Sequence, residues 1–376
     1  MLIKNGVLLN SKFEFVKADI SFENSILNIG ENLPCEKETL DFEGCYVLPG
    51  FVDTHMHGAV GKTFIDFTEE TAKEICEFEG RNGTTTIVPA ISAAPEEKMK
   101  KAVEYICSKA EDGFDGAKIR GIHLEGPFFA EKFKGAHLPE NIRKPSAEEA
   151  KRLIDSGNGL VKIITMAPEL ESGIETVEYI ADRGVTVSVG HSDGTYEETL
   201  EAFSHGATQT THTFNAMSPF NHRKPGVAGA AIMSPDVQCE LICDFFHVNK
   251  DVVGFLCKVK GMEKITMVTD SEVGTGMPDG QYEVNGRTLS VRNKCTYTED
   301  GTIAGGSSVL LDGVRNLVSI GIPLEEAVKA ATINGAKAAK IDGEVGSLET
   351  GKVADIIVLD KNLSLKAVFV SGKRIV

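Results

Sequence analysis

The chain has 376 residues, enough for one large core with a small appended unit or for two separate domains. Its formal net charge is −16 and it has no run of Lys and Arg that could follow a phosphate backbone, which argues against nucleic acid as a partner. No apolar stretch approaches the roughly 20 residues that span a bilayer, and the N-terminus lacks a secretory pattern, so we expect a cytoplasmic protein with no membrane partner.

The cysteines are scattered, and no two of them form a CxxC pair. Several lie inside apolar runs, which indicates buried free thiols in a reducing compartment and argues against a disulfide framework or a zinc cluster. The cysteines are Cys35, Cys45, Cys76, Cys107, Cys239, Cys243, Cys257 and Cys295.

The two ends of the chain share a pattern that the middle lacks. Residues 1–48 and residues 343–376 both alternate short apolar runs with turns and show no helical period. Each end is too short to bury a core alone. We therefore predict one small β-sandwich domain built from both termini, with residues 49–342 inserted as a second domain.

The middle of the chain alternates apolar or β-branched segments with amphipathic helical stretches. This alternation predicts a parallel sheet, and eight such segments predict a closed (β/α)8 TIM-like barrel in an α/β protein. The strand segments are 45–55, 84–91, 118–125, 161–167, 185–191, 207–213, 240–247 and 264–270. The helical segments are 68–81, 95–111, 146–157, 174–183, 197–204, 308–319 and 324–339.

Histidines and carboxylates stand at the C-terminal ends of six of these segments. In a barrel of this kind the strand ends converge on one mouth, where catalytic groups are found. A lone histidine at a strand end is usually structural. Packing does not readily explain why six separate segments each place a histidine or a carboxylate at the same rim. The residues are His55 and His57, Glu125, His191, His212, His247 and Asp270.

These residue types indicate a metal-dependent hydrolase. His55 and His57 are two residues apart, so both rings project from one side of an extended strand and can share a cation. Glu125, His191 and His212 offer one oxygen and two nitrogens, a set that leaves an open position for water. Such ligands suit Zn²⁺ but also Fe²⁺, Mn²⁺ or Co²⁺.

Asp270 follows a buried apolar segment, 265–269. A carboxylate beside a bound cation can accept the proton of a water molecule and return it to a leaving amine. Taken alone, an aspartate at this position could equally be a turn or cap residue. Together with the other strand-end residues it predicts a hydrolytic site, without naming a substrate.

The sequence around these positions resembles the N-acetylglucosamine-6-phosphate deacetylase family of the amidohydrolase superfamily. The HxH pair and Asp270 mark only the superfamily, whereas the strings HLEGPF, THTFNAM and RKPG are more specific to the deacetylase family. Order and spacing agree from about residue 45 to the C-terminus. The matching segments are 49–57, 121–128, 190–192, 211–217, 223–226, 242–247, 268–270, 311–318 and 346–355.

The resemblance implies an activity and roles for the residues. A member of this family converts N-acetyl-D-glucosamine 6-phosphate to D-glucosamine 6-phosphate and acetate. Glu125, His191 and His212 would hold the principal metal, and Asp270 would be the general acid and base. His55 and His57 match members that bind a second ion, so one or two ions per subunit are expected. His137 matches a loop histidine that helps to polarise the acetyl carbonyl.

The resemblance also implies a phosphate site. Asn215, the Ala216 backbone amide, Arg223 and His247 would meet the phosphate, which suits guanidinium, imidazole and backbone N–H donors. Without the resemblance, Arg223 could be a solvated loop residue and His247 a core histidine. Members can receive this arginine or its neighbour from the partner subunit, so a homodimer is expected. No role is assigned to His205, His222 or His123, although His123 shares the strand face of Glu125.

Two departures from the family pattern leave the exact sugar open. Asp244 is followed by Phe245-Phe246, where members commonly have glycine, and Asp270 is followed by Ser271-Glu272, where a small residue is usual. The bulk of the phenylalanines and the extra carboxylate of Glu272 could change which sugar epimer fits. N-acetylgalactosamine 6-phosphate therefore stays an alternative substrate.

Two further alternatives come from other classes. A dihydropyrimidinase-like or dipeptidase-like amidohydrolase would use a carboxylated strand-four lysine, but Lys162 opens its segment where such a lysine closes it. A non-catalytic scaffold would be expected to lose its metal ligands, whereas Glu125, His191, His212 and Asp270 are all present. Both alternatives are disfavoured.

Overall fold

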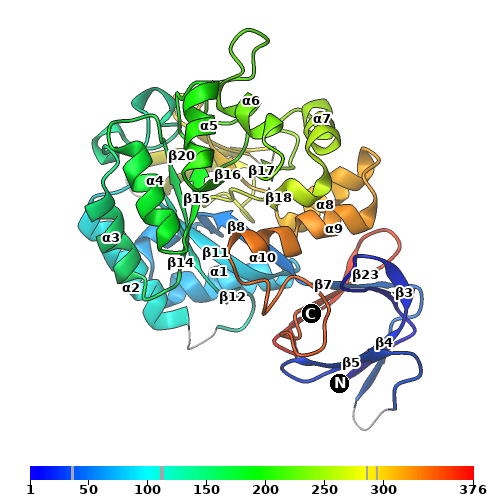
Figure 1. Ribbon diagram of the computed structural model, residues 1–376. Helices are drawn as coiled ribbons and strands as arrows, with labels where there is room; N and C mark the ends of the chain where they lie inside the picture. Colours follow the sequence, from blue (N-terminus) through cyan, green and yellow to red (C-terminus); the bar gives the residue numbers. More distant parts are fainter. Residues whose placement is uncertain (35–37, 111–113, 285–286, 294) are drawn as a thin grey trace.

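The computed structural model describes residues 1–34, 38–110, 114–284, 287–293 and 295–376 (Figure 1). Cys35, and Glu111 at the end of a predicted helix, lie outside the described residues. A large barrel and a smaller unit of β-sheets make up the protein, and both termini lie in the smaller unit. In the described part of the chain, no helix is both long and apolar enough to cross a bilayer.

Parallel strands form the barrel, and each pairs with its neighbours in the order that the sequence predicts. Between the last strand and the first, the Asp270 N–H donates to the His55 carbonyl at 2.9 Å, and Met56 bridges to Ser271 in parallel register. The predicted (β/α)8 barrel is confirmed. Its strands are β8 (Phe51–Met56), β11 (Thr84–Ser92), β12 (Lys118–Ile119) with β13 (Ile122–Glu125), β14 (Val161–Met166), β15 (Thr186–Val189), β16 (Ala207–Thr210), β17 (Gln238–Ile242) and β18 (Ile265–Val268).

Helices cover the outside of the barrel. Several begin at a side-chain cap: the Thr195 hydroxyl accepts from the Glu198 N–H while the Glu198 carboxylate accepts from the Thr195 N–H. The helices are α1 (Glu69–Arg81), α2 (Glu96–Ala110), α3 (Ala147–Ser156), α4 (Gly173–Asp182), α5 (Tyr196–Ser204), α6 (Gly226–Met233), α7 (Lys250–Lys260), α8 (Leu310–Ser319), α9 (Leu324–Ala330) and α10 (Ile333–Ala338).

Three helical features differ from the prediction. The predicted helix 324–339 is wrong as a single element, because Thr332 leaves the helical conformation and its hydroxyl bonds back to the Val328 carbonyl at 2.6 Å. The chain therefore turns between α9 and α10. Neither α6 nor α7 is predicted from the sequence. Helix α6 is buried almost all round, so its small apolar residues show no amphipathic period.

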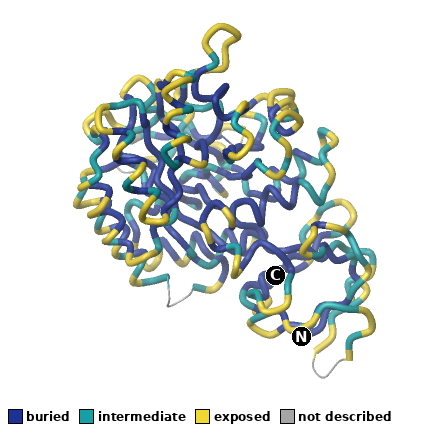
Figure 2. The backbone as a smooth tube through the Cα atoms, in the orientation of Figure 1, coloured by how far each residue is buried: buried dark blue, intermediate teal, exposed yellow. Residues whose placement is uncertain are grey.

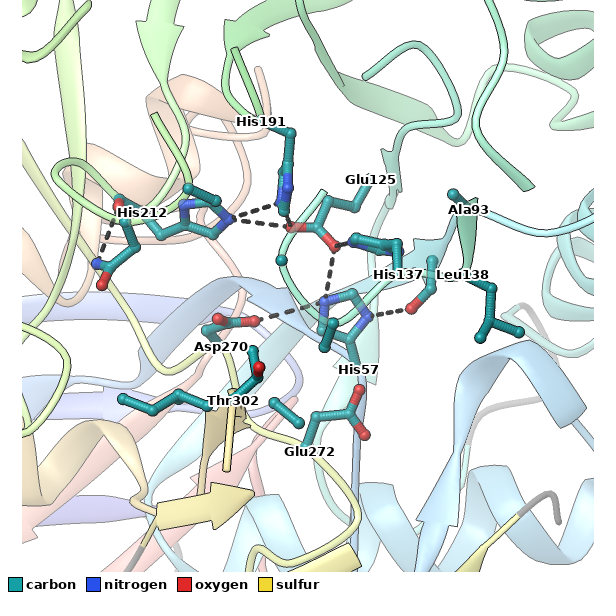
Figure 3. A pocket seen from close by; sticks show the side chains of 18 of the residues that line it. His57, Ala93, Glu125, His137, Leu138, His191, His212, Asp270, Glu272 and Thr302 are labelled. Carbon is teal, nitrogen blue, oxygen red and sulfur yellow. Dashed lines mark hydrogen bonds and ion pairs between the residues drawn. The ribbon is translucent and has the colours of Figure 1, made fainter. Parts of the chain in front are cut away.

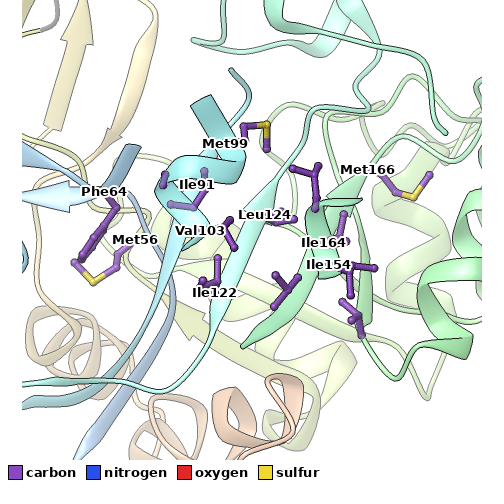
Figure 4. Packing of buried hydrophobic residues seen from close by; sticks show 14 of the residues in the cluster. Met56, Phe64, Ile91, Met99, Val103, Ile122, Leu124, Ile154, Ile164 and Met166 are labelled. Carbon is purple, nitrogen blue, oxygen red and sulfur yellow. The ribbon is translucent and has the colours of Figure 1, made fainter. Parts of the chain in front are cut away.

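The main core lies between the barrel strands and the helices. Met99 and Val103 of α2 pack in the same cluster as Ile91 of β11 and Leu124 of β13 (Figure 4). Burial follows this arrangement, since the barrel strands are buried along their length while the outer helix faces are exposed (Figure 2).

Strands from both chain ends form two facing sheets beside the barrel. Ile356 and Val358 of β23 point into the core between these sheets, while Ile357 and Leu359 face the helices of the barrel, as the period of two in a strand requires. One sheet has β5 (Ile26–Gly30), β4 (Asp19–Phe22), β1 (Leu2–Lys4) and β6 (Thr39–Asp41). The other has β25 (Lys373–Arg374), β24 (Leu365–Val370), β23 (Ile356–Leu359), β7 (Tyr46–Pro49), β2 (Val7–Leu9) and β3 (Phe15–Lys17).

The predicted segment 45–55 is two strands, so that prediction is corrected. Its first half, β7, pairs with β2 and β23 in the terminal sheet, and only β8 enters the barrel. The chain passes between the two units at Gly50, where an added Cβ would clash with the Thr85 side chain. We propose the domain division of residues 1–48 with 343–376, and 49–342, on this arrangement.

An antiparallel sheet that is not predicted from the sequence follows the last barrel strand. It consists of β19 (Gly280–Val284), β20 (Arg287–Arg292), β21 (Cys295–Thr298) and β22 (Ile303–Gly306), and Gly306 bridges to Ser271 beside the barrel mouth. Leu289 and Ile303 of this sheet line the cavity at that mouth. A short hairpin, β9 (Gly58–Ala59) and β10 (Lys62–Thr63), flanks β8.

Candidate metal centre

A cavity of about 640 Å³ opens at the C-terminal ends of the barrel strands. Most of the predicted site residues meet there, as Figure 3 shows for His57, Glu125, His137, His191, His212 and Asp270. Their side chains point toward one another from β13 and from the loops that follow β8, β13, β15, β16 and β18. The structure thus brings together groups that lie far apart in the sequence.

Left-handed backbone conformations place three of these side chains. The φ angles of His191, His212 and Asp270 are 50°, 29° and 48°, in a region that residues other than glycine rarely occupy. Each residue comes just after its strand, so the turn aims the side chain across the barrel mouth. Such conformations persist where the surrounding structure holds them, and they are concentrated at functional sites.

Glu125 lies at the centre of the cluster and is almost fully buried. Five histidines lie within 3.3 Å of its carboxylate, divided between its two oxygens. Oε1 faces His191 Nε2 at 3.1 Å, His212 Nε2 at 3.2 Å and His55 Nε2 at 3.3 Å, while Oε2 faces His137 Nε2 at 3.0 Å and His57 Nε2 at 3.2 Å.

Glu125, His191 and His212 fit a divalent cation. The His191 Nδ1–H donates to the Phe133 carbonyl at 2.8 Å, which leaves the Nε2 lone pair of the neutral ring free toward the cavity. His191 Nε2 and His212 Nε2 are 3.1 Å apart and both face the same carboxylate oxygen. Two ring nitrogens and one oxygen converging on a single point are a donor set for a cation.

His55, His57 and Asp270 form a second convergent set. Asp270 Oδ1 lies 3.4 Å from His57 Nε2 and 3.6 Å from His55 Nε2. His55 Nε2 is buried and has no hydrogen-bond partner. The Nδ1 atoms of both rings are engaged in hydrogen bonds. His57 Nδ1 bonds the Ser92 hydroxyl at 2.9 Å, and His55 Nδ1 bonds the Glu240 carboxylate at 3.0 Å. This set also fits a cation.

His123 supports the cluster without being free to bind an ion. Its Nδ1–H donates to the Thr54 carbonyl at 3.0 Å, and its Nε2 bonds the Thr165 hydroxyl at 2.7 Å. Both nitrogens are therefore engaged, although the ring stands edge-on to His55 at 4.5 Å between centroids.

The two carboxylates at the mouth are held in their ionised form. Burial alone raises the pKa of Glu125, but the charges of His57, His137 and His55 outweigh burial and hold the pKa well below its usual range. Burial likewise opposes ionisation of Asp270, but the hydrogen bond of His57 and the charge of His55 hold its pKa below the usual range. Both groups are available as ligands or bases at neutral pH.

His137 and Phe129 belong to the segment after β13. Figure 3 shows His137 beside Glu125, consistent with a group able to reach a ligand in the cavity. The Phe129 ring stacks on His191 at 4.2 Å between centroids and restricts the plane of the imidazole ring. Phe129, Ser92 and Glu240 are not among the predicted site residues, because Phe129 is apolar, Ser92 is not a usual metal ligand and Glu240 begins its predicted segment.

Most of the predicted phosphate-binding residues line the same cavity. Asn215, Ala216 and His247 lie in its wall. His247 Nδ1 bonds Asp244 at 2.7 Å, and its buried Nε2 has no hydrogen-bond partner. Burial alone lowers the pKa of His247, but the hydrogen bond and charge of Asp244 outweigh burial and raise it. The ring is thereby prepared to donate to an anion.

Arg223 stands apart from the other predicted site residues. It is exposed, is not part of the cavity wall and lies in the loop between β16 and α6, which projects from the barrel (Figure 1). His222, next to it, is also exposed, and His205 caps α5 and pairs with Glu178 at 2.6 Å. Neither histidine belongs to the cluster, and neither has a predicted role.

The two departures from the family pattern also have a structural setting. Glu272 lines the cavity, accepts from the Val273 N–H at 3.1 Å, and has its pKa raised by burial. Phe245 has a φ of 67°, which favours glycine, and Phe246 is 49% exposed.

Comparisons with known proteins agree with this geometry. Residues 46–375 match the amidohydrolase family. The chain is 33% identical to N-acetylglucosamine-6-phosphate deacetylase of Vibrio furnissii, over 87% of this chain and 82% of the relative. It is 31% identical to N-acetylgalactosamine-6-phosphate deacetylase of Escherichia coli O157:H7, over 86% of each. A solved structure of a deacetylase mutant from Mycobacterium smegmatis, in complex with N-acetyl-D-glucosamine-6-phosphate, covers 100% of this chain and 99% of its own, with a TM-score of 0.93 and 31% identity.

Proposed function

The chain belongs to the amidohydrolase family, and we propose that it deacetylates N-acetyl-D-glucosamine 6-phosphate, giving D-glucosamine 6-phosphate and acetate. One observation carries the proposal: a metal-ligand cluster with an adjacent carboxylate shares a cavity with anion donors. A substrate that carries both an amide and a phosphate needs the metal site and the anion donors in one cavity. The named relatives and the solved complex support this choice of substrate.

The metal ligands are proposed from the two convergent sets. Glu125, His191 and His212 hold the principal ion, and His55 with His57 hold a second one. Imidazole and carboxylate donors favour Zn²⁺, with Fe²⁺, Mn²⁺ and Co²⁺ as alternatives that metal analysis distinguishes. When bound, such an ion polarises the amide carbonyl and lowers the pKa of water.

Asp270 transfers the protons in this proposal. Its carboxylate is ionised, faces the cavity and lies 3.4 Å from His57 Nε2, so it can accept a proton from the attacking water. The same group then returns that proton to the leaving amine. His137 faces the cavity beside Glu125 and orients the acetyl carbonyl by a hydrogen bond.

The phosphate site is proposed in the same cavity, at the two residues that follow the His212 turn and at His247. His247 Nε2, the Asn215 amide and the Ala216 backbone N–H supply the donors. Ala216 adopts a φ of 44°, and a backbone that turns through the left-handed region can present its N–H groups to an anion. The raised pKa of His247 adds a charge-assisted hydrogen bond.

Arg223 is proposed to complete the phosphate site of a second subunit in a homodimer. Its loop carries Phe220, 51% exposed, which packs against Gly229 of α6. Met233 at the end of α6 is 65% exposed, and Phe255 on the adjacent α7 is 44% exposed. Exposed apolar side chains around a projecting basic loop suit contact with another copy of the chain.

The variant Arg223→Ala is expected to raise KM for the phosphorylated substrate by about 10- to 100-fold, the loss expected of one charge-assisted contact. KM for unphosphorylated N-acetyl-D-glucosamine should change little. Steady-state kinetics on both substrates measure the difference. Equal changes on both substrates would remove Arg223 from the phosphate site.

Mixing variants tests whether Arg223 acts across subunits. After the subunits of Arg223→Ala and Asp270→Asn are exchanged, a mixed dimer holds one site with Asp270 and a donated Arg223. About a quarter of all sites should then regain low KM if subunits pair at random. If mixed dimers form but no sites with low KM appear, Arg223 acts in the site of its own subunit.

N-acetyl-D-galactosamine 6-phosphate is the second candidate substrate. Glu272 in the cavity wall and the match to the galactosamine deacetylase favour it. Acetate release from the two 6-phosphates distinguishes the candidates, and we expect the higher kcat/KM with the glucosamine epimer. A higher value with the galactosamine epimer would reverse the assignment.

A further inference from the structure

Glu240 is a fully buried carboxylate on β17, in a position that the proposed reaction does not use. We propose that Glu240 is a positioning residue that fixes His55 for the second metal ion, so that its side chain decides whether this chain holds one ion or two. The inference rests on the proposed metal-dependent function. Its test measures metal content, which is independent of deacetylation.

The contacts of Glu240 use both carboxylate oxygens. Oε2 accepts from the His55 Nδ1–H at 3.0 Å and from the His212 backbone N–H at 3.3 Å. Oε1 accepts from the Gln209 amide at 2.7 Å. Because all three contacts come from N–H groups, the Glu240 carboxylate acts only as a hydrogen-bond acceptor.

This arrangement determines which nitrogen of His55 carries the proton. Since the carboxylate only accepts, Nδ1 keeps its proton, and Nε2 is the nitrogen of His55 that could bind a cation. That Nε2 is buried and lies between two carboxylates, 3.3 Å from Glu125 Oε1 and 3.6 Å from Asp270 Oδ1. Glu240 thus holds His55 Nε2 toward the point that His57 and Asp270 also face.

The two histidines of the second set are held with different strength. His57 Nδ1 bonds the Ser92 hydroxyl, which can donate or accept and therefore does not select one tautomer. His55 bonds a carboxylate, and the neighbouring His123 ring packs edge-on against it. Because His57 lacks such a partner, we expect occupancy of the second site to depend mainly on Glu240.

Glu240→Met tests the inference, since methionine keeps the length of the side chain and removes both acceptors. The second ion should bind about 10- to 100-fold more weakly, the range found for loss of a group that orients a metal ligand. Metal content after dialysis and chelator competition measure this change. Wild-type protein should retain two ions per subunit, and Glu240→Met only the principal one.

Two further variants separate positioning from general damage to the barrel. Glu240→Gln keeps an oxygen acceptor for His55 and should restore most of the second-ion affinity. Thr266→Val is the matched control, because Thr266 pairs with Glu240 across β17 and β18, is equally buried, and its hydroxyl has no hydrogen-bond partner. Thr266→Val should keep both ions.

Three results would overturn the inference. Retention of both ions by Glu240→Met would show that His55 needs no fixed partner. Loss of both ions together would show that Glu240 only maintains the barrel mouth. Wild-type protein that binds a single ion would remove the second site. In each case deacetylation of the 6-phosphate by wild-type protein, assayed separately, would leave the proposed function standing.

Discussion

Replacing Asp270 with asparagine is expected to lower kcat by about 10²- to 10⁴-fold, the range for loss of a general acid and base. Asparagine keeps the shape of the side chain but cannot accept the proton of the attacking water. The principal metal should remain, because Glu125, His191 and His212 are unchanged. Steady-state kinetics together with metal analysis measure both effects.

The metal measurement decides how the Asp270→Asn result is read. A loss of turnover with the principal ion retained supports proton transfer by Asp270. A variant that loses the principal ion but keeps full activity per bound ion would show that Asp270 serves as a ligand and not as the base. A thermal unfolding curve close to that of the wild type checks that the barrel remains folded.

Replacing Glu125 with glutamine is expected to remove the principal ion and reduce deacetylation to background. Glu125 lies between five histidines and supplies the one carboxylate of the principal set. A neutral amide is a weaker ligand for a divalent cation than a carboxylate. It also lacks the negative charge that Glu125 places beside the surrounding imidazole rings. Metal content and activity should therefore fall together.

Glu79→Gln is the matched control for Glu125→Gln. Glu79 is also a buried glutamate of the barrel, but it lies beside Thr84 at the start of β11, away from the cavity wall. Burial raises the pKa of Glu79 to about 8, so the group is mostly neutral at pH 7 and glutamine is a close substitute. Glu79→Gln should keep its metal, and an equal loss in both variants would mean that the Glu125 effect is not specific.

The sequence predicts the barrel and the ligand cluster for the same physical reason. A buried parallel strand is a short apolar run, and the polar residue that ends it marks the barrel mouth. Glu125, His191, His212 and Asp270 can be found in this way before their side chains are placed. The facing terminal strands are also visible as apolar runs without a helical period.

Other features leave no such signal. Glu240 lies inside a strand and points into the barrel, so a linear reading shows only a polar residue within an apolar run. Helix α6 is apolar all round, and the sheet β19–β22 follows the last barrel strand without matching the alternation of strand and helix. The role proposed for Arg223 depends on a second subunit and came from the resemblance alone.

The ends of the barrel strands and the sheet β19–β22 place the proposed activity in one mouth of one barrel. The proposed ligands Glu125, His191 and His212 line the same cavity as His247 and Asn215, and Leu289 of the sheet β19–β22 adds to its wall. The arrangement accounts for a substrate that carries an amide at one end and a phosphate at the other.

The most direct test is acetate release from N-acetyl-D-glucosamine 6-phosphate by protein stripped of metal and then reloaded with Zn²⁺ in measured amounts. We expect no activity in the stripped protein, recovery in proportion to bound Zn²⁺, and a much lower kcat/KM with unphosphorylated N-acetyl-D-glucosamine. Full activity in metal-free protein, or equal kcat/KM with and without the phosphate, would contradict the account.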